Sequence, residues 1–166
     1  DTGTLTEVAR YTTAECPVHL AFAGSRLFYG AGCGQWNGTI GSVDAATGTG
    51  LQTLSTASLY SAPLLDGAGD TLVAGVGGIS SGPVYTYTVT GATVTALAQK
   101  NIDGYLARVS VSPDGRRVAT ASGSPYYLAQ YDAATMAVAG SFETGPYPAD
   151  VAYSNGGTWI GKTLRR

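Results

Sequence analysis

The sequence predicts an all-β fold built from four-stranded antiparallel repeats, and three observations support this prediction. The tetrapeptide Asp-Ala-Ala-Thr occurs at residues 44–47 and again at 132–135, 88 residues later, which corresponds to two steps of 44. The 166 residues include 24 glycines and 11 tyrosines but one methionine, a composition typical of strands and tight turns. Turns that contain glycine recur at similar intervals. A repeat of about 40–45 residues in such a chain indicates a β-propeller with one blade per repeat.

The first two strands of each repeat are predicted from two short apolar segments joined by a glycine-containing turn. The four copies occupy residues 18–28, 63–73, 108–120 and 150–160. Glycine adopts a positive φ without steric cost, so each turn can be tight. In the first copy, Gly24 and Ser25 predict a two-residue hairpin.

The third and fourth strands follow a polar, glycine-rich loop. Third strands are expected at residues 39–43, 84–89 and 128–131, and fourth strands at 51–54, 93–97 and 137–142. In the two Asp-Ala-Ala-Thr copies, the carboxylates of Asp44 and Asp132 can accept hydrogen bonds from amides two or three residues later, which closes an Asx-type turn. We therefore interpret both aspartates as structural residues.

The repeats divide one propeller portion, residues 1–166, into three full blades and two partial ones. The full blades are expected at 16–62, 63–106 and 107–149, and the partial ones at 1–15 and 150–166. Residues 1–6 align with a fourth strand and could complete the blade that begins at residue 150. The pattern leaves three arrangements open: a four-blade closure, half of an oligomeric ring, or a fragment of a ring of roughly six to eight blades.

The two cysteines, Cys16 and Cys33, are predicted to form a disulfide within the first blade. A hairpin at Gly24 and Ser25 would place them directly opposite each other, on a non-hydrogen-bonded pair with Cα atoms about 4.5 Å apart. A single bulge would break this register. The alternative is two free thiols in a cytosolic propeller, whereas a disulfide implies an oxidising compartment.

Composition argues against several classes of function. A net charge of −2 gives no basic surface for nucleic acid. No apolar run reaches 18 residues, so no membrane span is expected. Two cysteines and the single histidine, His19, do not make a plausible zinc site, so neither a metal nor a cofactor is predicted. No serine lies in a nucleophile elbow, and His19 is interpreted as a packing residue more readily than as a catalytic one.

The most distinctive surface is predicted in the loops between the second and third strands. These loops contain Trp36 and Asn37 in the first blade and Tyr126 and Tyr127 in the third. Flat aromatic rings beside small polar residues suit protein or carbohydrate recognition, although the same rings could pack between blades. A tyrosine also recurs in each connection between blades, which we interpret as a structural ring. The recurring tyrosines are Tyr60, Tyr105 and Tyr147.

Two motifs resemble the YVTN and lactonase-like family of propeller repeats. Residues 111–118 read Val-Ser-Pro-Asp-Gly-Arg-Arg-Val, and residues 131–135 read Tyr-Asp-Ala-Ala-Thr. The third repeat matches this pattern well. The first repeat matches it through residues 43–48, and the second repeat is degenerate. The resemblance implies blades and not one chemistry, since the family includes surface-layer proteins, secreted binding proteins and lactonases. The content of Ala, Gly and Thr also resembles that of secreted actinobacterial proteins.

We therefore expect a non-catalytic extracellular binding or scaffold module. Its partners would be a protein or carbohydrate ligand, together with either further copies of itself or the remainder of a longer propeller chain. Secretion or display at the cell surface would follow from the disulfide. The alternative is a lactonase-like or hydrolase propeller enzyme with its site in the central channel, because one fold hosts both functions.

Overall fold

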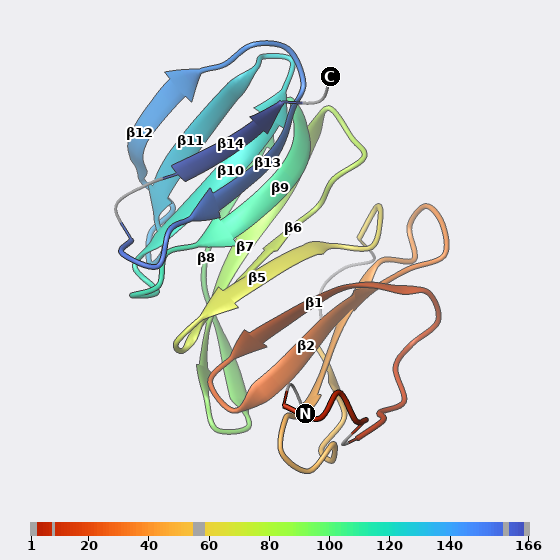
Figure 1. The fold of residues 1–166 in the computed structure, drawn as a ribbon. Coiled ribbons are helices and arrows are strands. Elements are labelled where there is room, and N and C mark those ends of the chain that lie inside the picture. The colour runs from red at the N-terminus through yellow and green to blue at the C-terminus, as the bar shows by residue number, and fades with distance from the viewer. Residues whose placement is uncertain (1–2, 8, 55–58, 158–159, 165–166) are drawn as a thin grey trace.

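The computed structural model describes residues 3–7, 9–54, 59–157 and 160–164, and these residues form strands, turns and loops without a helix. Three four-stranded antiparallel sheets and one two-stranded sheet follow one another along the chain. The first strands of successive sheets are neighbours in space, with β5 between β1 and β9, and β9 beside β13 (Figure 1). Nothing among the described residues is a helix of the length and apolarity that crossing a bilayer requires.

Each full sheet is a blade whose strands pair in chain order. The first blade contains β1 (Pro17–Ala23), β2 (Arg26–Ala31), β3 (Thr39–Asp44) and β4 (Gln52–Thr53). The second contains β5 (Leu64–Ala68), β6 (Thr71–Gly75), β7 (Ser81–Thr90) and β8 (Thr93–Asp103). The third contains β9 (Tyr105–Val111), β10 (Arg117–Gly123), β11 (Tyr127–Asp132) and β12 (Val138–Glu143). The last sheet pairs β13 (Pro148–Tyr153) with β14 (Ile160–Leu164).

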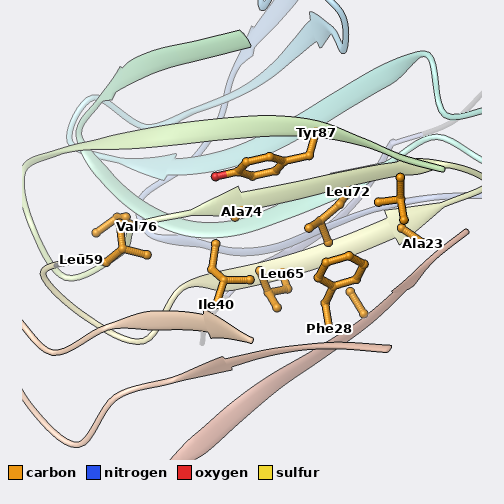
Figure 2. Packing of buried hydrophobic residues seen from close by; sticks show 11 residues of the cluster. Ala23, Phe28, Ile40, Leu59, Leu65, Leu72, Ala74, Val76 and Tyr87 are labelled. Carbon is orange, nitrogen blue, oxygen red and sulfur yellow. The ribbon is translucent and has the colours of Figure 1, made fainter. Parts of the chain in front are cut away.

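The hydrophobic core lies between the blades and not at a single centre. Alternate residues of a strand point to opposite faces of its sheet, so each blade packs one face on its predecessor and the other on its successor. Figure 2 shows the cluster between the first and second blades, with Phe28 and Ile40 from one side and Leu65, Leu72 and Tyr87 from the other. A second cluster joins the second and third blades, and a third places Val151 of β13 on the third blade.

Hydrogen bonds also join corresponding points of neighbouring blades. The Gly24 N–H in the first hairpin turn donates to the Gly69 carbonyl in the second at 2.7 Å, and the Thr71 hydroxyl donates to the Gly115 carbonyl in the third at 2.9 Å. The carboxylate of Asp66 on β5 accepts the Val111 N–H of β9 at 2.8 Å. The blades are therefore tied together at their turns and along their first strands.

The N-terminal segment differs from the expected strand. Residues 3–7 form a turn and irregular backbone, and residues 9–15 belong to no strand. The Tyr11 hydroxyl donates to the Ala45 carbonyl at 3.1 Å, and the Tyr11 ring lies against Gly48. The segment is thus held beside the first blade, whose own β4 already pairs with β3, and does not pair with β14.

The Asx-type turns predicted at Asp44 and Asp132 are confirmed. The Asp44 carboxylate accepts the N–H groups of Ala46 and Thr47 at 3.1 and 2.9 Å, and also the Thr47 hydroxyl. Asp132 accepts the corresponding groups of Ala134 and Thr135 at 3.1 Å each for the amides. The threonine hydroxyl is the main cause that holds the pKa of each carboxyl below its ordinary value.

These turns predict how stability responds to acid. Because the pKa values of Asp44 and Asp132 are lower in the folded state, their stabilising effect is complete above the ordinary carboxyl pKa of about 4 and is lost as the pH falls through the depressed values. We expect a variant with Asp44→Asn and Asp132→Asn to lose less stability on acidification than the parent chain does. Chemical unfolding followed by circular dichroism at a series of acidic pH values measures this difference, and parallel curves would contradict it.

The predicted disulfide between Cys16 and Cys33 is confirmed, with Cα atoms 5.2 Å apart, but the predicted register at its position is wrong. The two-residue hairpin pairs Ala23 with Arg26 as expected, and the register continues regularly to His19 and Gly30. A bulge then leaves Pro17 opposite Ala31. Proline has no N–H for the ladder, which is why strands accommodate it at bulges and edges.

Candidate functional site

Two aromatic pairs are formed where a loop between the second and third strands meets a connection between blades. In the first blade, the rings of Trp36 and Tyr60 meet edge to face, with centroids 5.3 Å apart. In the third blade, Tyr126 and Tyr147 meet in the same manner at 5.1 Å. Each pair is accompanied by a backbone hydrogen bond between loop and connection, from Trp36 N–H to the Tyr60 carbonyl and from Thr144 N–H to the Tyr126 carbonyl.

The first pair belongs to a loop that is ordered by its own contacts. The Asn37 side-chain oxygen accepts the Gly34 N–H at 3.0 Å, and the Gln35 amide donates to the Tyr60 hydroxyl at 2.7 Å. Trp36 takes a positive φ of 63° and stays 65% exposed. The Trp36 ring therefore combines a packing contact on Tyr60 with a face that is open to solvent.

The second pair borders a cleft between the third blade and the two-stranded sheet. This cleft has a volume of about 430 Å³, and its lining includes Tyr105 on β9, Ser124 in the loop, and Tyr147 beside β13. Tyr105 is 55% exposed and Tyr147 is 65% exposed. An adjoining hollow of about 560 Å³ is lined by the next residues of the same loop, Pro125, Tyr126 and Tyr127, and by Ser141, Glu143 and Thr144 of the strand and connection that follow.

A close backbone contact positions the cleft. Gly104 has a φ of +83°, and its Cα faces the carbonyl oxygen of Gly123 so closely that a side chain would not fit. Only glycine combines this φ with this approach at low cost. The contact brings Tyr105, the next residue, beside Ser124. The Ser124–Pro125 peptide bond is cis, and Ser124 has a φ of 52°.

Hydrogen bonds engage two of the phenol groups around the cleft and the adjoining hollow. A hydrogen bond to Tyr147 is the largest cause that raises the pKa of Tyr126, followed by partial desolvation. The Tyr127 hydroxyl donates to the Asp103 carbonyl at 3.0 Å. The site therefore presents hydroxyl groups, which can form hydrogen bonds, and ring faces, which can contact apolar surface.

A different set of polar residues lies on the first strands. Arg108 of β9 and Asp150 of β13 form an ion pair with a nitrogen–oxygen distance of 3.3 Å. Burial, and then the charge of Arg108, lower the pKa of His19 on β1. Within the described ranges, no three His, Cys, Asp or Glu side chains are grouped as a metal site would require.

The residues singled out from the sequence fall into two separate places. Trp36 and Asn37 lie on the first blade, Tyr126 and Tyr127 on the third, and the second blade stands between them. The cleft is also lined by Tyr105 and Tyr147, which the sequence analysis does not select as binding residues. Their recurrence with Tyr60 is the available signal, and its interpretation as a structural ring stays a prediction. Trp159, which the sequence predicts to pack between blades, lies outside the described residues.

Comparisons with known proteins identify the architecture. No model of a known protein family matches the sequence, and neither does any curated protein. Among solved structures, Hsv2 of Kluyveromyces lactis matches with a TM-score of 0.72 and 11% identity over 98% of this chain and 50% of that one. Hydrazine synthase of Kuenenia stuttgartiensis matches with a TM-score of 0.64 and 19% identity over 94% of this chain and 44% of that one.

These similarities establish the fold alone. The matched structures are β-propeller proteins, and this chain spans about half of their length. Together with the antiparallel four-stranded sheets, they confirm the predicted fold class: the chain is an all-β, partial β-propeller.

Proposed function

We propose that this chain is a non-catalytic binding module that holds a short carbohydrate or a peptide segment of a protein in the cleft between Tyr105 and Tyr147. The exposure of Tyr105 and Tyr147 in the lining of one cleft carries the proposal. Tyrosine offers a large contact area with few rotatable bonds, so it loses little conformational entropy when a ligand covers it. A volume of about 430 Å³ lies within the range of about 300–1,000 Å³ that ligand pockets occupy.

The blades give this cleft a rigid support. Tyr105 begins β9, and Tyr147 directly precedes β13, so both rings stand at the ends of paired strands. Because the strands that follow both tyrosines are already paired before a ligand arrives, binding does not require the connections to reorganise. The neighbouring Tyr126 and Tyr127, predicted from the sequence as binding residues, extend the same surface into the adjoining hollow.

An extracellular location is the second element of the proposal. The bridge between Cys16 and Cys33 supports secretion or display at the cell surface, because such bridges persist in oxidising compartments. The two motifs that resemble YVTN-like repeats form hydrogen-bonded turns, with the Ser112 hydroxyl donating to the Asp114 carboxylate and the Ala134 N–H donating to that of Asp132, and a relationship to that family is part of the proposal.

Binding of the chain to arrayed oligosaccharides and to a peptide library tests this proposal. For any ligand found, we expect Tyr105→Ala and Tyr147→Ala each to weaken binding by about 10- to 100-fold, the loss typical of a central aromatic contact. Trp36→Ala is the control, since Trp36 is an aromatic residue of the first blade that is as exposed as Tyr147, and its loss should leave the affinity at this cleft unchanged.

Two outcomes would contradict the proposal. One is a ligand whose affinity is insensitive to both tyrosine substitutions. The other is hydrolysis of a lactone or ester by the purified chain that is lost in His19→Ala, which would place a reaction near His19 and Arg108 on the first strands and favour the alternative of a propeller enzyme.

A further inference from the structure

The tyrosine cleft continues into a hollow that contains a carboxylate. Tyr147 lines the cleft, Tyr126 lines the adjoining hollow, and their rings meet with centroids 5.1 Å apart. Cleft and hollow are therefore two parts of one surface. We call it the tyrosine surface, which consists of the cleft at Tyr105 and Tyr147 and the hollow at Tyr126, Tyr127 and Glu143.

The strand register places Glu143 inside the hollow. Glu143 of β12 pairs with Tyr127 of β11, so their side chains lie on the same face of the third blade. Tyr127 packs against the hydrophobic cluster between the second and third blades, so this face is turned toward the second blade. All four strands of the second blade are present. Glu143 is therefore exposed beside a complete neighbouring blade.

The carboxylate of Glu143 has no cationic partner among the described residues. None of their ion pairs involves Glu143. The lining of the cleft contains no lysine or arginine, and neither does the lining of the hollow. A carboxylate that the protein does not neutralise favours a ligand of opposite charge.

A second acidic residue lies at the edge of the same hollow. The Tyr127 hydroxyl donates to the backbone carbonyl of Asp103 at 3.0 Å, which brings the end of β8 beside the third blade. Asp103 is exposed, and no ion pair among the described residues includes it. Its charge has the same sign as that of Glu143, so the two residues together favour a cation and repel an anion.

The aromatic rings add to this preference. The face of a phenol ring carries partial negative charge, and a cation that lies over it is attracted. The planes of Tyr126 and Tyr147 meet at 61°, so the two rings do not cover each other face to face. Tyr147 is also 65% exposed. Ring faces therefore remain available to a ligand that reaches from the cleft into the hollow.

The order of these features along the surface suits a basic side chain. The cleft is lined by uncharged residues, and the carboxylate lies in the hollow beyond the Tyr126–Tyr147 pair. Lysine and arginine have an aliphatic stem that can cover apolar surface and a charged group at its end. An arginine can also stack its planar guanidinium group on a ring. A neutral sugar would contact the rings but would leave the charge of Glu143 without a partner.

We propose, as an extension that rests on the function proposed above, that the tyrosine surface binds a peptide segment through a lysine or arginine side chain. The stem of this side chain lies on the rings of Tyr126 and Tyr147, and its charged group pairs with the carboxylate of Glu143. The apolar neighbours of the basic residue occupy the cleft beside Tyr105.

Capped synthetic peptides test the charge of the ligand with the unmodified chain. The peptides have blocked ends and apolar flanking residues, and they differ only at a central position, which is lysine, arginine, Nε-acetyllysine or glutamate. We expect the lysine and arginine peptides to bind about 5- to 10-fold more tightly than the acetyllysine peptide, the gain of a charged contact near a surface. The glutamate peptide should bind most weakly. Isothermal titration calorimetry measures the four affinities.

The variant Glu143→Gln tests the residue that recognises the charge. Glutamine keeps the size and the hydrogen-bonding capacity of glutamate and removes only the charge. We expect the lysine peptide to lose about 5- to 10-fold in affinity, whereas the acetyllysine peptide should bind as it does to the parent chain. Added salt should weaken the lysine peptide less in this variant than in the parent chain.

Glu15→Gln is the matched control. It removes the same charge from an exposed glutamate that precedes the first blade, so it changes the net charge of the chain equally. Its affinity for the lysine peptide should equal that of the parent chain. An equal loss in both variants would show that the peptide responds to net charge and would overturn the assignment of Glu143.

Tyr105→Ala and Tyr147→Ala separate this inference from the function on which it rests. A ligand that is lost in both tyrosine variants but binds equally well with lysine and acetyllysine would keep the binding cleft and overturn the cation preference. Neutral oligosaccharides that bind through the same tyrosines when no basic peptide does would have the same meaning. A basic peptide whose affinity is insensitive to both tyrosine variants would overturn the cleft itself.

Discussion

Replacing Phe28 by alanine is expected to lower the free energy of unfolding by about 3–5 kcal/mol, the range for a buried aromatic side chain in a core. Phe28 lies on β2 and is fully buried. It fills the space between the first two blades, near Leu65 and Leu72 (Figure 2). Strands on both sides are fixed by their own ladders, so the core cannot collapse to fill the cavity that alanine would leave.

Urea unfolding followed by circular dichroism measures this loss. Leu51→Ala serves as the control, because Leu51 is an apolar residue of the same blade but is 58% exposed, and we expect little change in its unfolding midpoint. A loss of less than about 1 kcal/mol in Phe28→Ala would be well below the range for buried aromatic residues and would show that the first blade is not packed on the second as described.

Removal of the disulfide is expected to lower the free energy of unfolding by about 3 kcal/mol, the value that the loop-entropy relation gives for a loop of this length. The bridge joins residues 17 apart in sequence and ties the bulged start of β1 to the end of β2. Without the bridge, the conformational entropy of the unfolded chain is higher, because the loop is no longer closed. The variant Cys16→Ser with Cys33→Ser should therefore unfold at a lower urea concentration than the parent chain.

The intact mass of the protein shows whether Cys16 and Cys33 are bridged, as this prediction assumes. Alkylation without reductant should add nothing to the intact mass, and alkylation after reduction should add two groups. Two added groups without reductant would refute the bridge. If the parent chain unfolds at the same urea concentration with and without reductant, the bridge contributes nothing to stability.

The blade organisation could be predicted because its signals are local. A turn at Gly24 and Ser25 needs only those two residues, and the turn at Asp132 needs only the carboxylate and the three residues that follow it. Such signals do not depend on tertiary contacts, so the strand pairs could be predicted from them. The disulfide followed as well, because a Cα separation of 5.2 Å accommodates a bridge despite the shifted register.

The exposure of individual side chains could not be predicted, because it depends on which blade lies opposite. Tyr60 and Tyr147 occupy comparable connections, and each meets one ring of a neighbouring loop, but Tyr60 precedes a full blade and is partly buried, whereas Tyr147 precedes a sheet of two strands and is exposed. The bulge near Pro17 was also missed, although a proline at the start of a paired strand was a visible warning. A sequence pattern describes the strands of a single blade, whereas the exposure of a side chain depends on how two neighbouring blades pack.

The hydrogen bonds between the hairpin turns have a geometric consequence for the propeller. The Gly24 N–H donates to the Gly69 carbonyl at 2.7 Å, and the Thr71 hydroxyl donates to the Gly115 carbonyl at 2.9 Å, so each bond fixes the separation of two consecutive blades at their hairpins. This separation helps to set the angle between the blades and therefore the curvature of the propeller. An insertion in one hairpin would therefore increase the separation between two consecutive blades at that end, while the strand pairing within each blade stays the same. The opposite ends of the second and third blades, where the tyrosine cleft lies, are joined as well, by the hydrogen bond from the Tyr127 hydroxyl to the Asp103 carbonyl and by the close approach of Gly104 to Gly123, so a change of length there would also move these two blades apart.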